Sequence, residues 1–150
     1  MKIRLLLITL ACALAAAPGV QAQAPAPKRA FDTPLSDQMA KMNDAFTALR
    51  ANITDATKNA DSLKQIATIK TAATAGLKFE PAKKAEIPPA DQAKFVSGFH
   101  EQLQMLIDQA GKLETALKAG DNAAAAKLLD DLGATQKAGH KEYKQKKKKA

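Results

Sequence analysis

The sequence predicts an all-α protein, an antiparallel four-helix bundle with up-down-up-down connectivity. Three observations point to this fold class. Apolar residues recur at steps of three and four along four separate segments, which is the spacing of one face of a helix. No stretch of useful length alternates apolar and polar residues, so no strand is expected. Two of the three connections are short, which makes consecutive helices antiparallel neighbours.

The first predicted helix opens at Thr33, with Pro34 at its first helical position, a combination typical of helix starts. One continuous apolar stripe is expected to face the core, formed by Leu35, Met39, Met42, Phe46, Leu49 and Ile53. The second predicted helix begins at the segment DSLKQ, where Ser62 and Gln65 have the spacing of a capping box. Gly76 is expected to end it.

The third predicted helix runs from about Asp91 to Lys118 and follows the longest, proline-containing connection. Its inward residues are expected to be Phe95, Phe99, Leu103, Leu106, Ala110, Leu113 and Leu117. Gly120 is predicted to stop this helix in the left-handed conformation, and Asp121 or Asn122 to cap the next one. One face of the fourth helix then carries Ala125, Leu129, Leu132, Gln136, Gly139, His140 and Tyr143.

The first 22 residues predict a cleavable secretory signal peptide. Basic MKIR precedes the apolar run LLLITLACALAAA, and Val20 and Ala22 have cleavage-site spacing. We expect cleavage after Ala22 and a periplasmic product, because the run is shorter than the about 20 residues of a membrane-spanning helix. A lipid anchor at Cys12 is disfavoured, since Thr9 stands where such motifs usually have leucine. A flexible lead-in (23–32), the bundle (33–145) and a basic tail (146–150) follow.

The charge balance argues against nucleic acid as a partner. The net charge of +8 falls to +6 in the mature chain, since cleavage removes Lys2 and Arg4. Much of the remaining excess lies in Lys144 and the lysines of the tail, so the body is nearly balanced. We interpret the tail as a solvated end; the alternative is weak electrostatic contact with an acidic partner or an anionic membrane. The mature chain has no cysteine, which excludes disulfides and covalent c-type haem.

Candidate ligands gather at one end of the predicted bundle. Met39 lies early in the first helix, Phe95 and Phe99 lie early in the third, and His140 lies near the end of the fourth. At 1.5 Å per residue, all four fall within about 10 Å of the same end. A thioether and an imidazole opposed across a phenylalanine-walled cavity form a ligand set for haem iron. The residues alone leave open that Met39 is core filler and His140 a solvated residue near a helix end.

Four segments resemble the soluble cytochrome b562 family: PLSDQMAKMNDAF, FVSGF, ALKAGDNAAAAKLLDDL and KAGHKEYK. The similarity spans nearly the whole mature chain. It implies an exported four-helix bundle that holds one non-covalent haem b per chain and carries electrons, without being an enzyme. It also implies that Met39 and His140 are the axial iron ligands and that Phe95 and Phe99 pack on the porphyrin. The expected cofactor-binding set is Met39, Met42, Phe95, Phe99, Gln136 and His140.

Two positions depart from the family pattern. Gln136 stands where the best-studied relatives have an arginine, which removes a positive charge near the haem. Gly139 stands where they have an aromatic residue, and we expect it to leave a gap or a loosened helix beside His140. His100 is expected at the surface because it is turned off the apolar stripe; a haem held by His100 and His140 is the alternative ligand set.

The leading functional interpretation is therefore a monomeric periplasmic haem b protein that transfers electrons to or from an unidentified redox partner protein. The alternative is a haem-free periplasmic helical-bundle adaptor or stress-related binding module, in which Met39, Phe95 and Phe99 are simply core residues. A haem enzyme that oxidises or reduces a small molecule is a third interpretation, and no substrate pocket is apparent in the sequence to support it.

Overall fold

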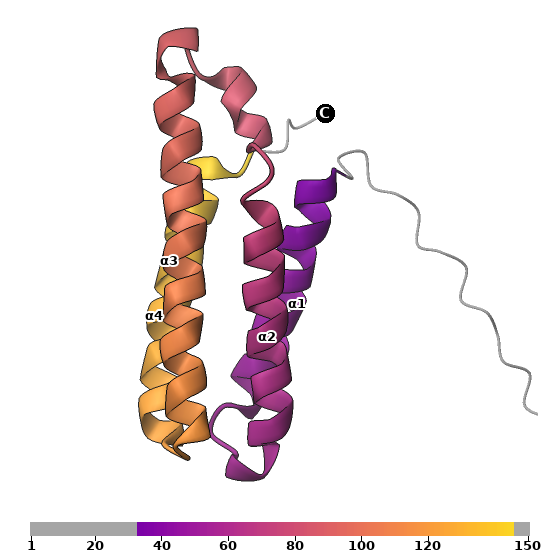
Figure 1. The fold of residues 1–150 in the computed structure, drawn as a ribbon, viewed down its shortest axis with the longest axis vertical. Helices are drawn as coiled ribbons and strands as arrows, with labels where there is room; N and C mark the ends of the chain where they lie inside the picture. The colour runs from indigo at the N-terminus through magenta and orange to yellow at the C-terminus, as the bar shows by residue number, and fades with distance from the viewer. Residues whose placement is uncertain (1–32, 146–150) are drawn as a thin grey trace, which may run out of the picture.

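The computed structural model describes residues 33–145, which form four α-helices and no strand within that range (Figure 1). The helices are α1 (Pro34–Asn52), α2 (Asn59–Gly76), α3 (Gln92–Lys118) and α4 (Asn122–Tyr143). The all-α prediction is thereby confirmed. The predicted signal peptide (1–22), lead-in (23–32) and basic tail (146–150) lie outside the described residues.

The helices run side by side along the long axis of the molecule, each packed on the next in the chain. Figure 1 shows α1 with α2 on one side and α3 with α4 on the other. The predicted up-down-up-down bundle is confirmed. One end of the bundle holds the start of α1, the end of α2, the start of α3 and the end of α4. Helices α1 and α4 approach each other less closely than the three consecutive pairs do.

Helix α1 begins where the sequence predicts, at a complete capping box. The Thr33 hydroxyl accepts a hydrogen bond from the backbone N–H of Ser36 at 3.2 Å, and the Ser36 hydroxyl accepts one from the N–H of Thr33 at 2.9 Å. These bonds satisfy two backbone donors that would otherwise lack partners at a helix start. Pro34, which has no N–H, occupies the first helical position.

The predicted start of α2 at Ser62 is wrong: the helix begins at Asn59. A 3-10 turn, Ala56–Lys58, leads directly into it, and Asp55 caps that turn by accepting a hydrogen bond from the N–H of Thr57 at 2.9 Å. No capping box is therefore needed at Ser62, which lies fully buried inside the helix. The start is further fixed by reciprocal amide hydrogen bonds between Asn59 and Asn122 of α4, at 2.8 and 3.1 Å.

Helix α2 ends at Gly76 as predicted, but not through a left-handed glycine. Among the described residues, only Gly120 has a positive φ, of 75°. Gly76 is instead buried in close contact with a neighbouring helix: a Cβ there would lie 3.1 Å from Leu103 Cδ1 of α3. Gly120 stops α3 as predicted, and Asp121 caps α4 by accepting from the N–H of Ala124 at 2.8 Å. The α2–α3 connection contains two further 3-10 turns, Ala82–Glu86 and Pro89–Asp91.

The predicted stripes form the core. Its buried apolar residues come from all four helices and the residue after α1: Met42, Ala45, Phe46, Leu49, Ile53, Ile66, Ile69, Ala72, Ala73, Phe99, Leu103, Leu106, Ala110, Leu113, Leu117, Ala125, Leu129 and Leu132. In α4 the fully buried positions stop at Leu132. Beyond it Gln136 and Tyr143 are half-buried and the packing loosens toward the end that carries the candidate ligands.

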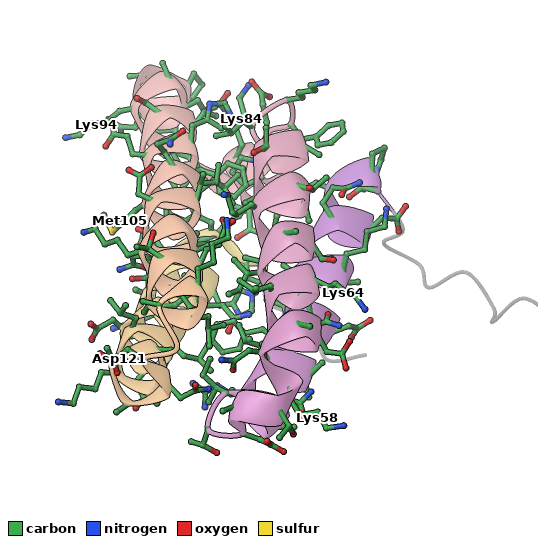
Figure 2. All side chains as sticks on the ribbon, turned by 60° about the horizontal axis from the view of Figure 1, so that its bottom comes forward. Lys58, Lys64, Lys84, Lys94, Met105 and Asp121 are labelled. Atoms are coloured by element: carbon green, nitrogen blue, oxygen red, sulfur yellow. The ribbon has the colours of Figure 1, made fainter. Side chains whose placement is uncertain are left out.

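Charged side chains surround this core. Figure 2 shows Lys58, Lys64 and Lys94 directed away from the helices into solvent. Among the described residues, Met105 on α3 is a large apolar side chain that is exposed, with 48% of its surface accessible. No helix within residues 33–145 is long and apolar enough to cross a membrane.

Candidate functional site

The contact between α1 and α4 sets the register of the two candidate ligands. Phe46 Cζ on α1 lies 3.4 Å from the position that a Cβ of Gly133 on α4 would occupy. Met39 is seven residues before Phe46, and His140 is seven residues after Gly133. Because α1 and α4 are antiparallel, both steps lead toward the same end by about 10 Å. Seven residues are nearly two full turns, so Met39 and His140 lie at one level, on the sides of their helices that carry Phe46 and Gly133. The Met39 side chain reaches toward α2, and His140 is exposed.

Met39 reaches from α1 into apolar surroundings. Its side chain is half-buried against the core, and its Cε lies 3.4 Å from where a Cβ of Gly76 would stand. Leu35 and Leu103 approach the same point on α2, so the thioether end lies among apolar groups from three helices. A methionine in such a place is a soft, polarisable donor in a water-poor setting.

Met42 and Gln136 occupy the turn between the Phe46–Gly133 contact and the level of Met39 and His140. Met42 is four residues before Phe46 and is buried, with 8% of its surface exposed. Gln136 is three residues after Gly133 and is half-buried. Both sequence-predicted residues therefore lie one turn below the candidate ligands, Met42 offering an apolar surface and Gln136 an uncharged polar one.

His140 lies at this end of α4, and its side chain is exposed. Desolvation, with a smaller contribution from the positive charge of Lys144, lowers the pKa of His140 below its ordinary value of 6.5. The ring is therefore neutral at pH 7 and has a nitrogen lone pair to offer a metal. Within residues 33–145, the ring of His140 makes no hydrogen bond to another group. The ring of His100 does make one.

Phe95 and Phe99 form an aromatic cluster with Tyr143 of α4. The ring centroid of Tyr143 lies 5.0 Å from that of Phe95 and 5.5 Å from that of Phe99. Phe99 is buried, whereas Phe95 is half-buried. Sequence reasoning placed Tyr143 on the inward face of α4 but did not assign it to the site. Its position three residues after His140, one turn away on the same helix, was the available signal.

His100, expected at the surface, is half-buried and makes a hydrogen bond within the fold. Its ring lies 5.7 Å from the ring centroid of Phe99, and its Nε2 is 3.0 Å from the carbonyl oxygen of Phe79. That hydrogen bond ties His100 to the segment that follows α2 and occupies one of its two possible ligand nitrogens. The geometry thus disfavours a haem held by His100 and His140.

The gap expected beside Gly139 is filled. A Cβ at Gly139 would lie 3.2 Å from Cγ of Gln102 on α3. The Gln102 amide donates a hydrogen bond to the carbonyl of Thr135 at 2.9 Å, one turn before Gly139. Helix α4 continues unbroken through Gly139 to Tyr143, so the helix is not loosened there either.

A groove of about 490 Å³ lies at the same end of the molecule, between the start of α3, the end of α4 and the connection before α3. Its apolar wall comes from Ile87, Phe95 and Tyr143, and its rim carries charged groups such as Lys94 and Glu101. Neither Met39 nor His140 lines it. Within the described residues, no group of three or more histidine, cysteine or acidic side chains is arranged to hold a metal ion.

Fold and site together define a class: an antiparallel four-helix bundle with a thioether and an imidazole at one level near one end. The family model of cytochrome b562 matches residues 34–144, almost the whole bundle. The chain belongs to the cytochrome b562 family, whose members bind haem and carry electrons and are not enzymes. No curated protein shows a significant match to the chain.

Proposed function

We propose that the protein is a periplasmic electron carrier that holds one non-covalent haem b, with Met39 and His140 as the axial iron ligands. The observation that carries this proposal is the register set by Phe46 and Gly133. This register supports the proposal because it puts the residues Met39 and His140 at one level of α1 and α4.

The residues at this level fit a haem. Met39, Met42 and Leu103 supply apolar surface for the porphyrin, and the neutral ring of His140 supplies a nitrogen donor. Helices α1 and α4 are the neighbouring pair that packs least closely, so a flat group between them requires less displacement of backbone than elsewhere. Gln136 presents no charge to the haem carboxylates, unlike the arginine of relatives.

Haem, when bound, supplies a one-electron couple, and the chain decides how that couple is used. Met39 and His140 would together hold the iron, and ligation by two protein side chains would favour electron transfer over the binding of small molecules. The Met39 thioether favours the ferrous state and raises the reduction potential relative to a second imidazole. The surrounding apolar residues exclude water and hold the ligands in place.

The sequence features outside the bundle support the rest of the proposal. The signal-peptide pattern of residues 1–22 favours export to the periplasm. The mixed surface charge favours a monomer that meets a redox partner protein transiently, without nucleic acid. The lysines of residues 146–149 would at most strengthen such an encounter with an acidic partner or an anionic membrane.

Reconstitution with haemin and absorption spectroscopy test the ligand assignment. We expect low-spin, six-coordinate spectra for the wild-type protein, and high-spin spectra for Met39→Ala and His140→Ala. Matched controls are Met105→Ala, which removes an exposed methionine, and His100→Ala, which removes the other histidine. Both should remain low-spin.

Low-spin spectra that survive in Met39→Ala and His140→Ala would contradict the proposal. If the protein is instead a haem-free adaptor, a thermal melt should show that the apo-protein unfolds cooperatively and that haemin leaves its melting temperature unchanged. A carrier that binds haem only in its folded state melts at a higher temperature when haem is present.

A further inference from the structure

Among the described residues, no protein group makes a hydrogen bond to the ring of His140 that could orient it as a metal ligand. Metal-binding histidines normally donate the other ring N–H to a carboxylate, a carbonyl or a water, and loss of that partner weakens metal binding about 10- to 100-fold. The direction of the His140 ring therefore depends on how firmly the last turn of α4 is held.

Tyr143 holds that turn against α3. It lies one turn after His140, and the backbone N–H of the next residue, Lys144, donates to the carbonyl of His140 at 3.2 Å. The Tyr143 ring packs on Phe95 and Phe99 at tilted angles of 55° and 65°. Such aromatic pairs contribute stabilisation beyond their buried area. The end of α4 is thus fixed by a rigid ring between two other rings.

The absence of a side chain at Gly98 makes room for this ring. A Cβ at Gly98 would lie only 2.7 Å from the Tyr143 hydroxyl oxygen, while Cζ of the same ring would be 3.8 Å away, an ordinary contact. The clash therefore involves the hydroxyl oxygen alone. Because the ring packs on Phe95 and Phe99, moving the hydroxyl aside would disturb these two aromatic contacts.

A second element, the turn Ala82–Glu86, holds the same helix end. The Lys83 ammonium donates to the backbone carbonyl of Glu142 and lies 5.9 Å from the centre of the Phe95 ring. The Gln145 amide donates to the Glu86 carboxylate at 2.9 Å. A lysine on a terminal carbonyl satisfies an acceptor that the helix leaves unpaired and complements the helix dipole.

We propose that Tyr143, seated on Gly98 between Phe95 and Phe99, is a positioning residue for the iron ligand His140. This inference rests on the proposed function, since it assigns the aromatic cluster a purpose only if His140 binds iron. Phe95 and Phe99 then also act on His140, through Tyr143 and the last turn of α4.

A double-mutant cycle tests the hydroxyl contact. Gly98→Ala should lower haem affinity about 10-fold or more, the scale of a lost orienting partner, and add high-spin character at haem saturation. Introducing Gly98→Ala into the Tyr143→Phe variant, which lacks the clashing oxygen, should change affinity less than about 3-fold, because coupled residues are not additive. Gly111→Ala is the matched control: it lies in the same helix, and a Cβ there meets nothing within 4 Å.

The outcomes separate this inference from the proposed function. A low-spin wild-type protein whose Gly98→Ala variant melts earlier but keeps its spectrum and affinity would show that the cluster is merely structural. Equal effects of Gly98→Ala in the wild-type and in the Tyr143→Phe background would also overturn the inference. If the wild-type protein itself forms no low-spin haem, the proposed function fails, and the positioning role fails with it; the apo-protein melts still report the hydroxyl contact.

Discussion

The ring of Phe46 on α1 lies against the backbone of Gly133 on α4, with its Cζ 3.4 Å from the place of a Cβ. The guanidinium of Arg50 covers the same glycine and lies 5.0 Å from the centre of the Phe46 ring. This contact is where α4 comes close to α1, and the separation of the candidate ligands two turns away depends on it.

A large side chain at Gly133 should therefore force α1 and α4 apart. We expect Gly133→Leu to destabilise the apo-protein by about 1–3 kcal/mol, the usual cost of overpacking, and to reduce the low-spin haem fraction. Chemical denaturation and haem titration measure both effects. Gly133→Ala is the control: the exposed Arg50 can swing out, and alanine restores about 1 kcal/mol of helix propensity. Equal stability of the Gly133→Leu and Gly133→Ala variants would refute the contact's role.

Gly76 is expected to be sensitive for a different reason, because it packs on a core leucine and on Met39. A Cβ there would lie 3.1 Å from Leu103 Cδ1 and 3.4 Å from Met39 Cε. In Gly76→Ala we expect the propensity gain to be offset by repacking, and the Met39 thioether to be displaced. Gly111→Ala, with open space around it, should instead raise stability by about 0.5–1 kcal/mol. Thermal melts and the spectrum of the haem-loaded variants distinguish the two glycines.

The core of α4 should lose most stability at Leu132. This side chain is fully buried, whereas Leu128 on the same helix is partly buried against the core. We expect Leu132→Ala to lower the free energy of unfolding by about 3 kcal/mol, through lost burial and the cavity left behind. Leu128→Ala should cost clearly less, about 1 kcal/mol, since less apolar area leaves water. Urea unfolding of both apo-variants gives the comparison, and equal losses would argue against the assigned burial.

Glu114 should contribute to the loss of stability at acidic pH. Its carboxylate bridges Lys118 at 2.5 Å and Lys70 of α2 at 2.8 Å. These two ammonium groups, Lys118 first, lower the pKa of Glu114 from 4.5 to about 2. Because the folded pKa lies below the unfolded one, the stabilisation is present above about pH 4.5 and is lost as the pH falls toward 2.

The Glu114→Gln variant checks this sign. Unfolding measured from pH 7 to pH 2 should show the wild-type advantage over the variant shrinking below about pH 4.5. Lys70→Met should raise the Glu114 pKa measured by NMR titration. A wild-type advantage that stays constant down to pH 2 would contradict the assigned ion pairs.

Much of this molecule is determined locally and could be predicted from the sequence. The cap at Thr33, the left-handed Gly120 and the apolar stripes each depend on residues within one or two turns, so their physical causes are visible in the chain itself. Residue type and position along the predicted helices made Met39 and His140 possible ligands, and the resemblance to the cytochrome b562 family selected them.

Other features required the tertiary structure. Helix α2 begins at Asn59 and not at the predicted Ser62, because Asp55 caps the preceding turn and Asn122 of α4 bonds to Asn59 across the bundle. Gly76 proved to be a packing residue because Leu103 approaches it from another helix. Gln102 fills the space beside Gly139 for the same kind of reason.

The sequence by itself determined which residue types could bind haem and on which helices they lie. Only the tertiary structure decided their register, through Phe46 on Gly133, and the support of the last turn of α4, through Tyr143 on Gly98. The physical reason is that a helix pattern fixes which face points inward, whereas the level at which two helices meet depends on side chains from both. Close contacts between helices often involve glycines, such as Gly133 and Gly98. The sequence alone does not show which aromatic ring will pack against a given glycine.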